Sequence, residues 1–310
     1  MLRLLAFRHL DPARWATCLA AAPPPVLPYA QWWWLAATAG CWAAVVELGP
    51  GGEYRSLLPL PWHWRPAGRV VYQPHFTQQL GLVCTPASQY RQLSEYLAVA
   101  ATYCHQLYRQ LPPQPLPPLP PGWQVAERLT YHLDLGPAYA QLQAAYTPDY
   151  RRRLRRNAEA AQPLQVVAGE NLDELIQLFL SYKPAAATGM HPRHYAPLRR
   201  LWVVARQRGA AELRQVRHPA TGELLAGALF VQHPGGIIYL FAAASAAGRA
   251  AGAPLLLLDD ALRRCAGRAG QVLDFEGGSR PELARFFANF GARPVQYPTL
   301  TFSRRPWFFL

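Results

Sequence analysis

Hydrophobic positions along the chain recur with two periods, and each change of period marks a predicted element. In the first half, a helix is predicted over 11–22, with Asp11 as its N-cap and Pro12 in its first turn, and a short helix over 29–38. Apolar runs bounded by glycine-rich turns then predict three strands over 42–48, 54–60 and 69–72. A last stretch, 88–111, has apolar residues at alternating spacings of four and three, which predicts one long helix. Its apolar stripe comprises Leu93, Leu97, Ala100, Cys104, Leu107 and Leu111.

The second half repeats this layout. Helices are predicted first, then a three-stranded meander, a helix, a short strand and a final helix. The predicted ranges are 173–182 and 192–208 for the first helices, 212–218, 224–232 and 236–242 for the meander, and 254–265, 272–275 and 281–289 for the rest. The repeat is one of layout and not of residues. It predicts an internal duplication with a mixed α/β (α+β) fold, in which each copy has a mostly antiparallel central sheet flanked by helices.

A proline-rich run at 112–121 separates the two halves. Such a run adopts an extended polyproline II conformation and acts as a stiff spacer, although a P-x-x-P ligand for a partner domain is the alternative. We therefore predict two domains, 1–121 and 122–310, with the active cleft in the second.

Charge and cysteine content narrow the possible partners and compartment. The 310 residues carry a formal net charge of +13, which favours an anionic partner such as nucleic acid, a phosphorylated cofactor or an anionic membrane surface. Almost all basic residues are Arg, so part of this charge is also explained by a genome-wide compositional bias. The five cysteines include no C-x-x-C pair, which favours free thiols in a reducing compartment. The longest apolar stretch, 35–46, is shorter than the roughly 20 residues of a membrane helix. We expect a soluble cytoplasmic protein without a transmembrane segment.

Two acids stand at the end of the predicted strand 272–275. Asp274 and Glu276 alternate with Leu273 and Phe275, so both are predicted on one face of the strand, next to a glycine-rich turn. In a cleft, Glu276 would serve as a general base. The alternative is that these acids pair with nearby arginines or cap the next helix.

The order of elements resembles the GNAT acyltransferase fold, and a tandem pair resembles the Fem-type family and its acetyltransferase-like relatives. Fem-type proteins transfer amino acids from aminoacyl-tRNA to peptidoglycan precursors. Four segments carry the resemblance: the acidic strand end 273–277 with the F-x-x-x-F-G helix 286–292, the basic helix 150–158, and in the first half 58–61 and 73–81.

The resemblance implies a site for the coenzyme A pyrophosphate between the last meander strand and the following helix. The motif [Q/R]-x-x-G-x-[G/A] binds phosphate there through backbone N–H groups at a helix N-terminus. This sequence has Arg249, Ala250, Ala251, Gly252 and Ala253 in place, whereas Pro254 departs from the pattern and lacks an N–H. Phe287 stands where many GNAT enzymes have a tyrosine that protonates the departing thiolate, so another group must serve or none is needed.

Two further groups are candidates for substrate or anion binding. In the basic helix, Arg152 and Arg156 share a face at i, i+4 and suit a phosphate, although a solvated helix face is the alternative. His191 and His194 belong to a predicted loop after Gly189, and the resemblance to GNAT proteins implies that this region shapes the acceptor pocket. No carboxylate or thiolate is near them in sequence, so no metal is predicted.

These observations predict an N-acyltransferase that moves an acyl group, with acetyl-CoA or another acyl-CoA as co-substrate, to an amine of a small molecule or a cell-wall precursor. Asp274 and Glu276 are the predicted catalytic residues. Two alternatives stay open: a Fem-type transfer that uses tRNA, and a GNAT-fold binding protein without catalysis.

Overall fold

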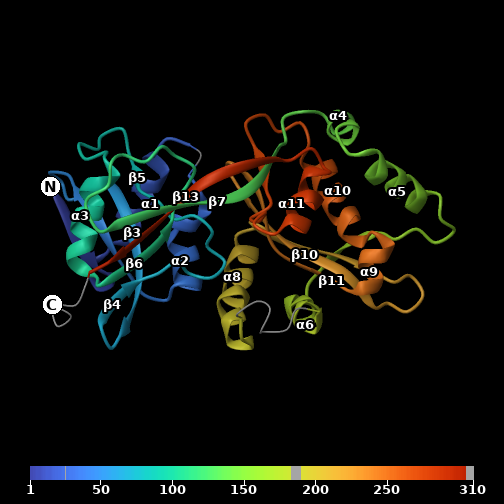
Figure 1. Ribbon diagram of the computed structural model, residues 1–310, viewed down its shortest axis with the longest axis horizontal. Coiled ribbons are helices and arrows are strands. Elements are labelled where there is room, and N and C mark those ends of the chain that lie inside the picture. The colour runs from blue at the N-terminus through green and yellow to red at the C-terminus, as the bar shows by residue number, and fades with distance from the viewer. Residues whose placement is uncertain (25, 183–189, 305–310) are drawn as a thin grey trace. The chain divides into compact units, whose positions relative to one another are not determined.

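The computed structural model describes residues 1–24, 26–182 and 190–304 and divides into two compact units (Figure 1). The first unit contains residues 1–128 and 296–310, and the second contains 129–295. The division predicted from the proline-rich run, 1–121 and 122–310, places the whole C-terminal segment in the second domain. In the structure, the last part of the final strand instead belongs to the first unit, because residues 299–303 pair with residues 106–110.

The first unit is a mixed sheet with helices on both faces. Its strand order is β1-β2-β3-β4-β6-β13, with β5 beside β3; β4 and β6 are parallel and the other described pairs are antiparallel. The helical segments are η1 (Phe7–His9), α1 (Pro12–Ala21), η2 (Pro28–Ala30), α2 (Trp32–Thr38) and α3 (Leu93–Tyr103). The strands are β1 (Leu2–Ala6), β2 (Trp42–Leu48), β3 (Tyr54–Arg65), β4 (Gly68–Val71), β5 (Val83–Cys84), β6 (Gln106–Gln110) and the second half of β13 (Arg293–Ser303).

Alternation along β2 fills the core on both faces of this sheet. Ala43 and Val45 pack in a cluster with α3, whereas the ring of Trp42 contacts Trp15 of α1 and Trp32 of α2. The predicted N-cap is confirmed: Asp11 Oδ1 accepts hydrogen bonds from the backbone N–H groups of the next turn.

The predicted helix 88–111 is wrong in its second part. Helix α3 ends at Tyr103, and Gln106–Gln110 form strand β6 between β4 and β13. The four–three spacing continues through Leu107 and Leu111 by coincidence, because alternate residues of a buried strand also fall at intervals of four. Residues 106–110 pair with β13, and residues 106 and 107 also pair with β4, so the backbone of this segment finds its hydrogen-bond partners in the sheet.

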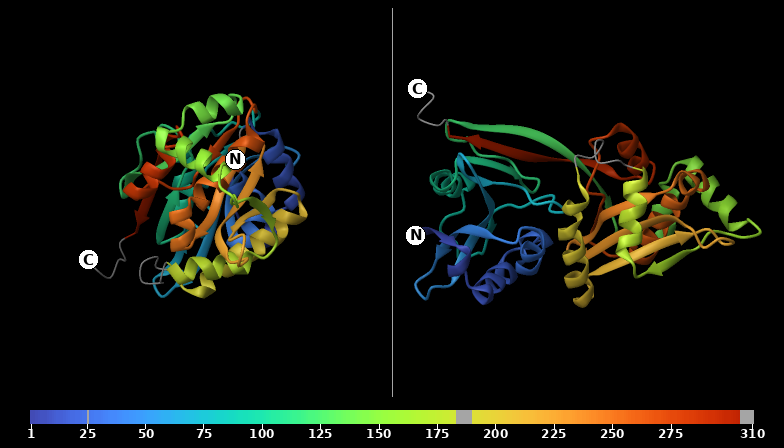
Figure 2. Two further views of the ribbon diagram at one scale, coloured as in Figure 1. Left: turned by 90° about the vertical axis from the view of Figure 1, so that its right-hand side faces the viewer. Right: turned by 90° about the horizontal axis from the view of Figure 1, so that it is seen from below.

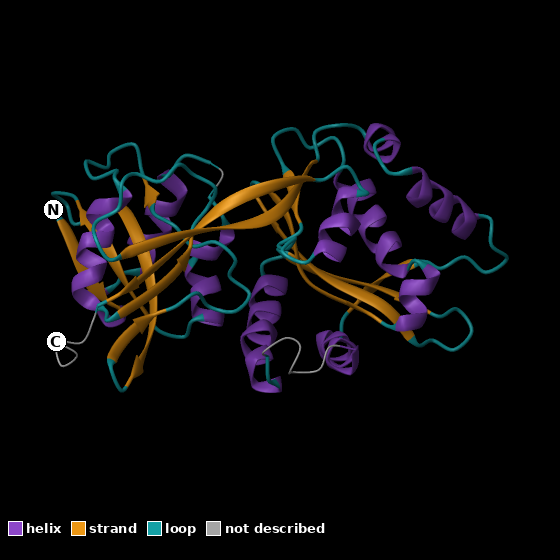
Figure 3. Ribbon diagram, in the orientation of Figure 1, coloured by secondary structure: helices purple, strands orange, loops and turns teal. Residues whose placement is uncertain are grey.

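The second unit is a sheet in the order β7-β12-β11-β10-β9-β8, also covered by helices on both faces (Figures 2 and 3). Only β11 and β12 are parallel among its described pairs. Helices α9, α10 and α11 lie on one face, and α6 and α8 on the other (Figure 1). The helical segments are α4 (Tyr139–Ala144), α5 (Pro148–Ala158), α6 (Leu172–Tyr182), η3 (Pro192–Tyr195), α8 (Ala196–Gln207), α9 (Ala246–Ala251), α10 (Ala253–Cys265) and α11 (Pro281–Ala288). The strands are the second half of β7 (Trp123–Asp134), β8 (Val166–Gly169), β9 (Ala211–Arg217), β10 (Leu224–His233), β11 (Gly236–Ala244) and β12 (Val272–Asp274).

The predicted meander, the helix over 254–265 and the strand–helix pair at the C-terminal side are confirmed as β9, β10, β11, α10, β12 and α11. Strands β1, β5, β7, β8 and β13 and helix α4 were not predicted. All five cysteines are free thiols, as expected. Within the described residues, no helix has the length and apolar character that crossing a membrane requires.

Candidate functional site

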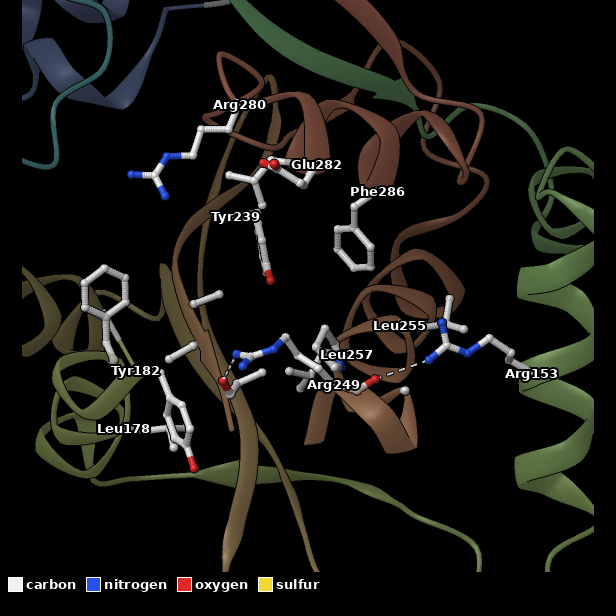
Figure 4. Close-up of a pocket in the computed structure, with 17 residues that line it drawn as sticks. Arg153, Leu178, Tyr182, Tyr239, Arg249, Leu255, Leu257, Arg280, Glu282 and Phe286 are labelled. Carbon is white, nitrogen blue, oxygen red and sulfur yellow. Dashed lines mark hydrogen bonds between the residues drawn. The ribbon is translucent and has the colours of Figure 1, made fainter. Parts of the chain in front are cut away.

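A cavity of about 640 Å³ opens in the second unit where the strands β11 and β12 part (Figure 4). Strand β12 ends at Asp274, so its pairing with β11 stops at Ile238. Strand β11 continues to Ala244 beside β10 alone, which leaves its backbone from Tyr239 onward without a strand on the β12 side. Residues of α5, α6, α9, α10 and α11 complete the wall.

Two guanidinium groups mark one end of the cavity. Arg249 of α9 donates from Nη1 to the carbonyl of Ala244 over 2.7 Å, and its guanidinium lies 5.5 Å from the ring of Tyr182. Arg153 of α5 donates from Nη2 to the backbone carbonyl of Arg249 over 3.3 Å. The side chains of both arginines line the cavity, so this end carries concentrated positive charge.

Packing of α5 decides which of its five arginines reaches the cavity. Tyr150 is buried and Leu154 is half-buried, and both pack on the core of the second unit. Because residues three or four apart share a helix face, the side that carries Tyr150 and Leu154 also directs Arg153 inward. The predicted anion-binding pair lies elsewhere: Arg152 and Arg156 are exposed and do not line the cavity, and Arg152 pairs with Asp149 over 2.5 Å.

The turn between α9 and α10 is the segment predicted to bind a pyrophosphate. Gly252 has φ +80° and joins the two helices, a conformation that favours glycine. A Cβ atom added there would lie 3.3 Å from Arg153 Nη2. Arg249 and Gly252 line the cavity, whereas Ala250, Ala251 and Ala253 do not, and Ala253 is buried in the core of the second unit.

Few backbone donors remain in this turn. The N–H of Gly252 donates to Arg249, and those of Leu255 and Leu256 donate to Gly252. Pro254 has no N–H. The N–H groups of Leu255 and Leu256 are therefore already used within the chain.

Three oxygen-bearing side chains line the described part of the cavity: Tyr182, Tyr239 and Glu282. Glu282 comes from the first turn of α11 and is exposed. Tyr239 comes from β11, directly after the last residue paired with β12. Figure 4 shows its hydroxyl directed toward the middle of the cavity. Burial of the ring raises the pKa of Tyr239 above its ordinary value, so its hydroxyl is neutral.

The predicted catalytic acids do not line this cavity. Asp274 is buried, and its carboxylate accepts hydrogen bonds from Thr130 Oγ1 over 2.6 Å and from the backbone N–H of Glu276 over 2.9 Å. Its second oxygen lies 3.4 Å from His132 Nε2. Asp274 therefore ties β12 to β7.

Glu276 is not on the strand face predicted for it. Side chains alternate only while the backbone stays extended, and β12 ends two residues earlier, at Asp274. Glu276 has φ +49°, a left-handed conformation that is uncommon for a residue with a side chain. It is half-buried in the turn that leads to α11.

The remaining sequence candidates are placed as follows. His194 lies in η3 and His191 is the N-cap residue before it; the backbone N–H of His191 donates to His194 Nδ1 over 3.2 Å, and neither residue lines the cavity. Phe287 is buried, with its ring centroid 4.4 Å from that of Phe275, so it is a core residue. In the described part of the chain, no three His, Cys, Asp or Glu residues are arranged to hold a metal ion.

Sequence reasoning missed Arg153, Tyr239 and Glu282. The basic helix was recognised, but its inward face depends on packing. Tyr239 belongs to the apolar strand Gly-Ile-Ile-Tyr-Leu-Phe. Its hydroxyl is the one polar side-chain group of this run, and this is the sequence feature that could have identified it as a functional residue. The sequence does not indicate a functional role for Glu282, because an acidic residue after a proline in the first turn of a helix is common and is explained by the helix dipole.

Comparisons with known proteins agree with this architecture. Residues 145–282 match the family described as acetyltransferase (GNAT) domain. The structure resembles the crystal structure of FemX with a TM-score of 0.64 and 12% identity, covering 96% of each chain. It resembles a tandem GNAT protein from the clavulanic acid biosynthesis pathway with a TM-score of 0.54 and 14% identity, covering 97% of this chain and 98% of the other.

A third likeness is to L-PGS from Bacillus licheniformis, with a TM-score of 0.51 and 12% identity, covering 95% of this chain and 92% of the other. At these identities the likeness shows the fold. No curated protein sequence matches the chain. The predicted tandem GNAT fold and its resemblance to Fem-type proteins are thereby confirmed.

Proposed function

Because residues 145–282 match the acetyltransferase (GNAT) domain within a tandem GNAT fold, we propose that the protein is an N-acyltransferase. It moves an acyl group from an acyl-CoA such as acetyl-CoA to the amine of a small molecule or a cell-wall precursor. The observation that carries the proposal is the cavity at the open edge of β11, with Arg153 and Arg249 at one end and Tyr239 and Glu282 in its wall.

The charged end of the cavity suits the pyrophosphate of coenzyme A. Each guanidinium has five N–H donors, and one of them is used in the bond that each arginine makes to a backbone carbonyl. The others can bind phosphate oxygens, together with the positive end of the α10 helix dipole. Side-chain donors therefore take over the part of the site that Pro254 removes from the backbone motif of Arg249, Ala250, Ala251, Gly252 and Ala253.

The open edge of β11 suits the extended arm that joins the pyrophosphate to the thioester. This arm contains two amides, and amides form hydrogen bonds with an unpaired strand edge in the same way as another strand does. Residues 239–244 present such an edge. The apolar side chains of Leu255, Leu257 and Phe286 line the same space and exclude water from the arm.

At the other end, Glu282 is the carboxylate we propose as the base for the amine. An ammonium group must lose a proton before its nitrogen can attack, and a carboxylate at hydrogen-bond distance accepts that proton. Asp274 and Glu276 remain the alternatives to Glu282 as catalytic carboxylates, although their side chains are not part of the cavity wall.

Binding of an acyl-CoA tests the proposal directly. A ligand at 100 times its Kd stabilises the folded state by about 2.7 kcal/mol, so acetyl-CoA or a longer acyl-CoA is expected to raise the melting temperature measurably. Arg153→Ala removes a charged donor to phosphate worth about 1.5–3 kcal/mol and is expected to weaken acyl-CoA binding about 10- to 100-fold.

The matched control is Arg155→Ala, on the same helix, exposed and outside the cavity wall. It is expected to leave the affinity within about twofold. No melting shift with any member of an acyl-CoA panel, or equal losses in both variants, would count against the proposed site.

A second candidate function is transfer from aminoacyl-tRNA, and one observation favours it. Arg152 and Arg156 are exposed on the outer side of α5, beyond what an acyl-CoA in the cavity would use. Salt-sensitive tRNA binding that is weakened by Arg152→Ala and Arg156→Ala, in the absence of any acyl-CoA effect, would favour this function.

A further inference from the structure

Tyr239 brings a hydroxyl group to the cavity wall. No hydrogen-bond partner for its hydroxyl exists among the described residues. Its ring is half-buried and packs against the core of the second unit, with centroid distances of 5.4 Å to Phe230, 6.3 Å to Phe275 and 6.4 Å to Phe287. The hydroxyl opens on the cavity, so a ligand atom that enters the cavity can accept a hydrogen bond from it.

The position of Tyr239 in the sheet relates its hydroxyl to the reacting end of the cavity. Tyr239 is the first residue of β11 beyond the pairing with β12, so it stands where the two strands begin to part. Figure 4 places its hydroxyl between the guanidinium of Arg249 on one side and the α11 residues Glu282 and Phe286 on the other. A ligand whose phosphates lie at Arg249 would therefore bring its acyl group toward this hydroxyl.

We propose that Tyr239 is the hydrogen-bond donor to the oxyanion that forms when the amine attacks the acyl carbonyl. This inference rests on the proposed function and names a catalytic residue for it. The amine nitrogen forms a bond to the carbonyl carbon, and the carbonyl π electrons move to oxygen. The Tyr239 hydroxyl donates to that oxygen and keeps its own proton. When the C=O bond re-forms, the C–S bond breaks and sulfur leaves with the electron pair. The proton lost by the amine goes to Glu282 or to water.

This role also explains why Phe287 is tolerated where a proton donor is expected. A thiol has a pKa of about 8.5, so the thiolate is a good leaving group near neutral pH and can take its proton from water afterwards. The oxyanion is far more basic and needs stabilisation inside a cavity with apolar walls. A tyrosine whose pKa is raised by burial suits this task, because it stays neutral and donating over the working pH range.

Tyr239→Phe is the decisive variant. Phenylalanine fills the same ring space, so folding and the Kd for acyl-CoA are expected to be unchanged. The kcat of acyl transfer is expected to fall about 10²- to 10³-fold, as it does when one oxyanion donor is removed. The matched control is Tyr131→Phe, since Tyr131 is also half-buried against the same core but lies outside the cavity wall. A kcat for Tyr239→Phe within about twofold of the wild type would overturn the inference.

A change of leaving group separates an oxyanion donor from a leaving-group acid. An aryl thioester releases a far less basic thiolate than coenzyme A, so it needs no acid. If Tyr239 donates to the oxyanion, the loss in Tyr239→Phe is the same for alkyl and aryl thioesters. If the loss disappears with the aryl thioester, Tyr239 protonates sulfur and the inference is overturned.

A binding measurement gives a readout that does not need turnover. A ketone analogue of acetyl-CoA, with CH₂ in place of sulfur and a ¹³C-labelled carbonyl, is bound to the wild type and to Tyr239→Phe. A downfield carbonyl shift in the wild type that is lost in the variant is expected from a hydrogen bond to that oxygen. Binding to both proteins with the same shift would overturn the inference and leave the proposed function standing. Failure of the wild type to bind would overturn the proposed function, and the inference with it.

Discussion

Glu276 and Glu282 lie in the same stretch between β12 and the first turn of α11, yet the structure gives them different surroundings. Glu276 follows the strand end in a left-handed conformation, and its backbone N–H donates to Asp274. Glu282 contributes its side chain to the cavity wall. We propose Glu282 rather than Glu276 as the base for the amine because the side chain of Glu282 lines the cavity and that of Glu276 does not.

Glu282→Gln tests this choice. Removing a general base typically costs about 10²- to 10⁴-fold, so kcat/KM for acyl transfer is expected to fall by that factor at neutral pH. Glu276→Gln is the matched comparison and is expected to keep most of the activity. Steady-state rates of both variants with one acyl-CoA and one amine decide it. The reverse order of losses would restore Glu276 as the base.

At the same scale, the sequence predicts that the basic helix binds an anion but not which arginine does so. The five arginines of α5 are chemically alike. Burial of Tyr150 and Leu154 turns Arg153 toward the cavity and leaves Arg152 and Arg156 outside. The helical repeat determines which side chains share a face of α5. Packing on the core determines which of these faces is turned toward the cavity.

At the scale of elements, a buried glutamate of the first unit anchors a loop to its sheet. Glu47 of β2 is 1% exposed and accepts hydrogen bonds from Ser88 Oγ over 2.6 Å and from the backbone N–H of Gln89 over 3.0 Å. Burial raises the pKa of Glu47, but hydrogen bonds from Ser88, Gln89, Tyr90 and Ser56 outweigh it, and the pKa is lower than usual. The ionised carboxylate therefore stabilises the fold.

The lowered pKa of Glu47 makes its contribution to the free energy of unfolding depend on pH. A carboxyl group with a lowered folded-state pKa contributes stability above its unfolded pKa of about 4.3 and loses it as the pH falls through the folded pKa. Glu47→Gln is expected to lower the free energy of unfolding by about 1.5–3 kcal/mol at pH 7, and by much less in acid. Urea unfolding of wild type and variant from about pH 7 down to about pH 3 measures this.

The control is Glu53→Gln, at an exposed position beside Arg55, which is expected to change stability little at any pH. A Glu47→Gln deficit that is equal in acid and at neutral pH would show that shape, and not charge, is what the loop requires.

At the scale of the whole molecule, the chain enters the second unit along β7 and returns to the first along β13. The final part of β13 pairs with β6, with Leu300 opposite Arg109 and Ser303 opposite Gln106. Leu300 is fully buried in the core of the first unit. The first unit is therefore completed by residues almost 170 positions after its main segment ends at Arg128.

Leu300→Ala tests whether the last part of β13 stabilises the first unit. Deleting a buried leucine side chain costs about 2–5 kcal/mol, and the loss is expected in the first unit although the change is near the C-terminus. Amide hydrogen exchange in β6 is expected to speed up accordingly. The neighbouring exposed Thr301→Ala is the control and is expected to leave exchange unchanged. Faster exchange in β11 with β6 unaffected would contradict the assignment of β13.

The order and type of most elements follow from the sequence alone. Period-two and period-3.6 patterns specify α1, the β9–β11 meander, α10 and α11, since each of these elements buries one face. Gly252 marks the turn between two helices because its backbone conformation favours glycine. The strand β6 was missed because its apolar spacing also fits the end of a helix, and only pairing with β4 and β13 distinguishes the two.

The tertiary structure alone decides which side chains share the cavity. The sequence determined a tandem GNAT layout, a basic helix and an arginine–glycine turn, because these depend on local spacing and backbone preference. It did not determine that Arg153, Tyr239 and Glu282 line one space, or that the last strand completes the first unit. Those relations join residues far apart in the chain, and they are set by the packing of α5 and by the point where β12 leaves β11.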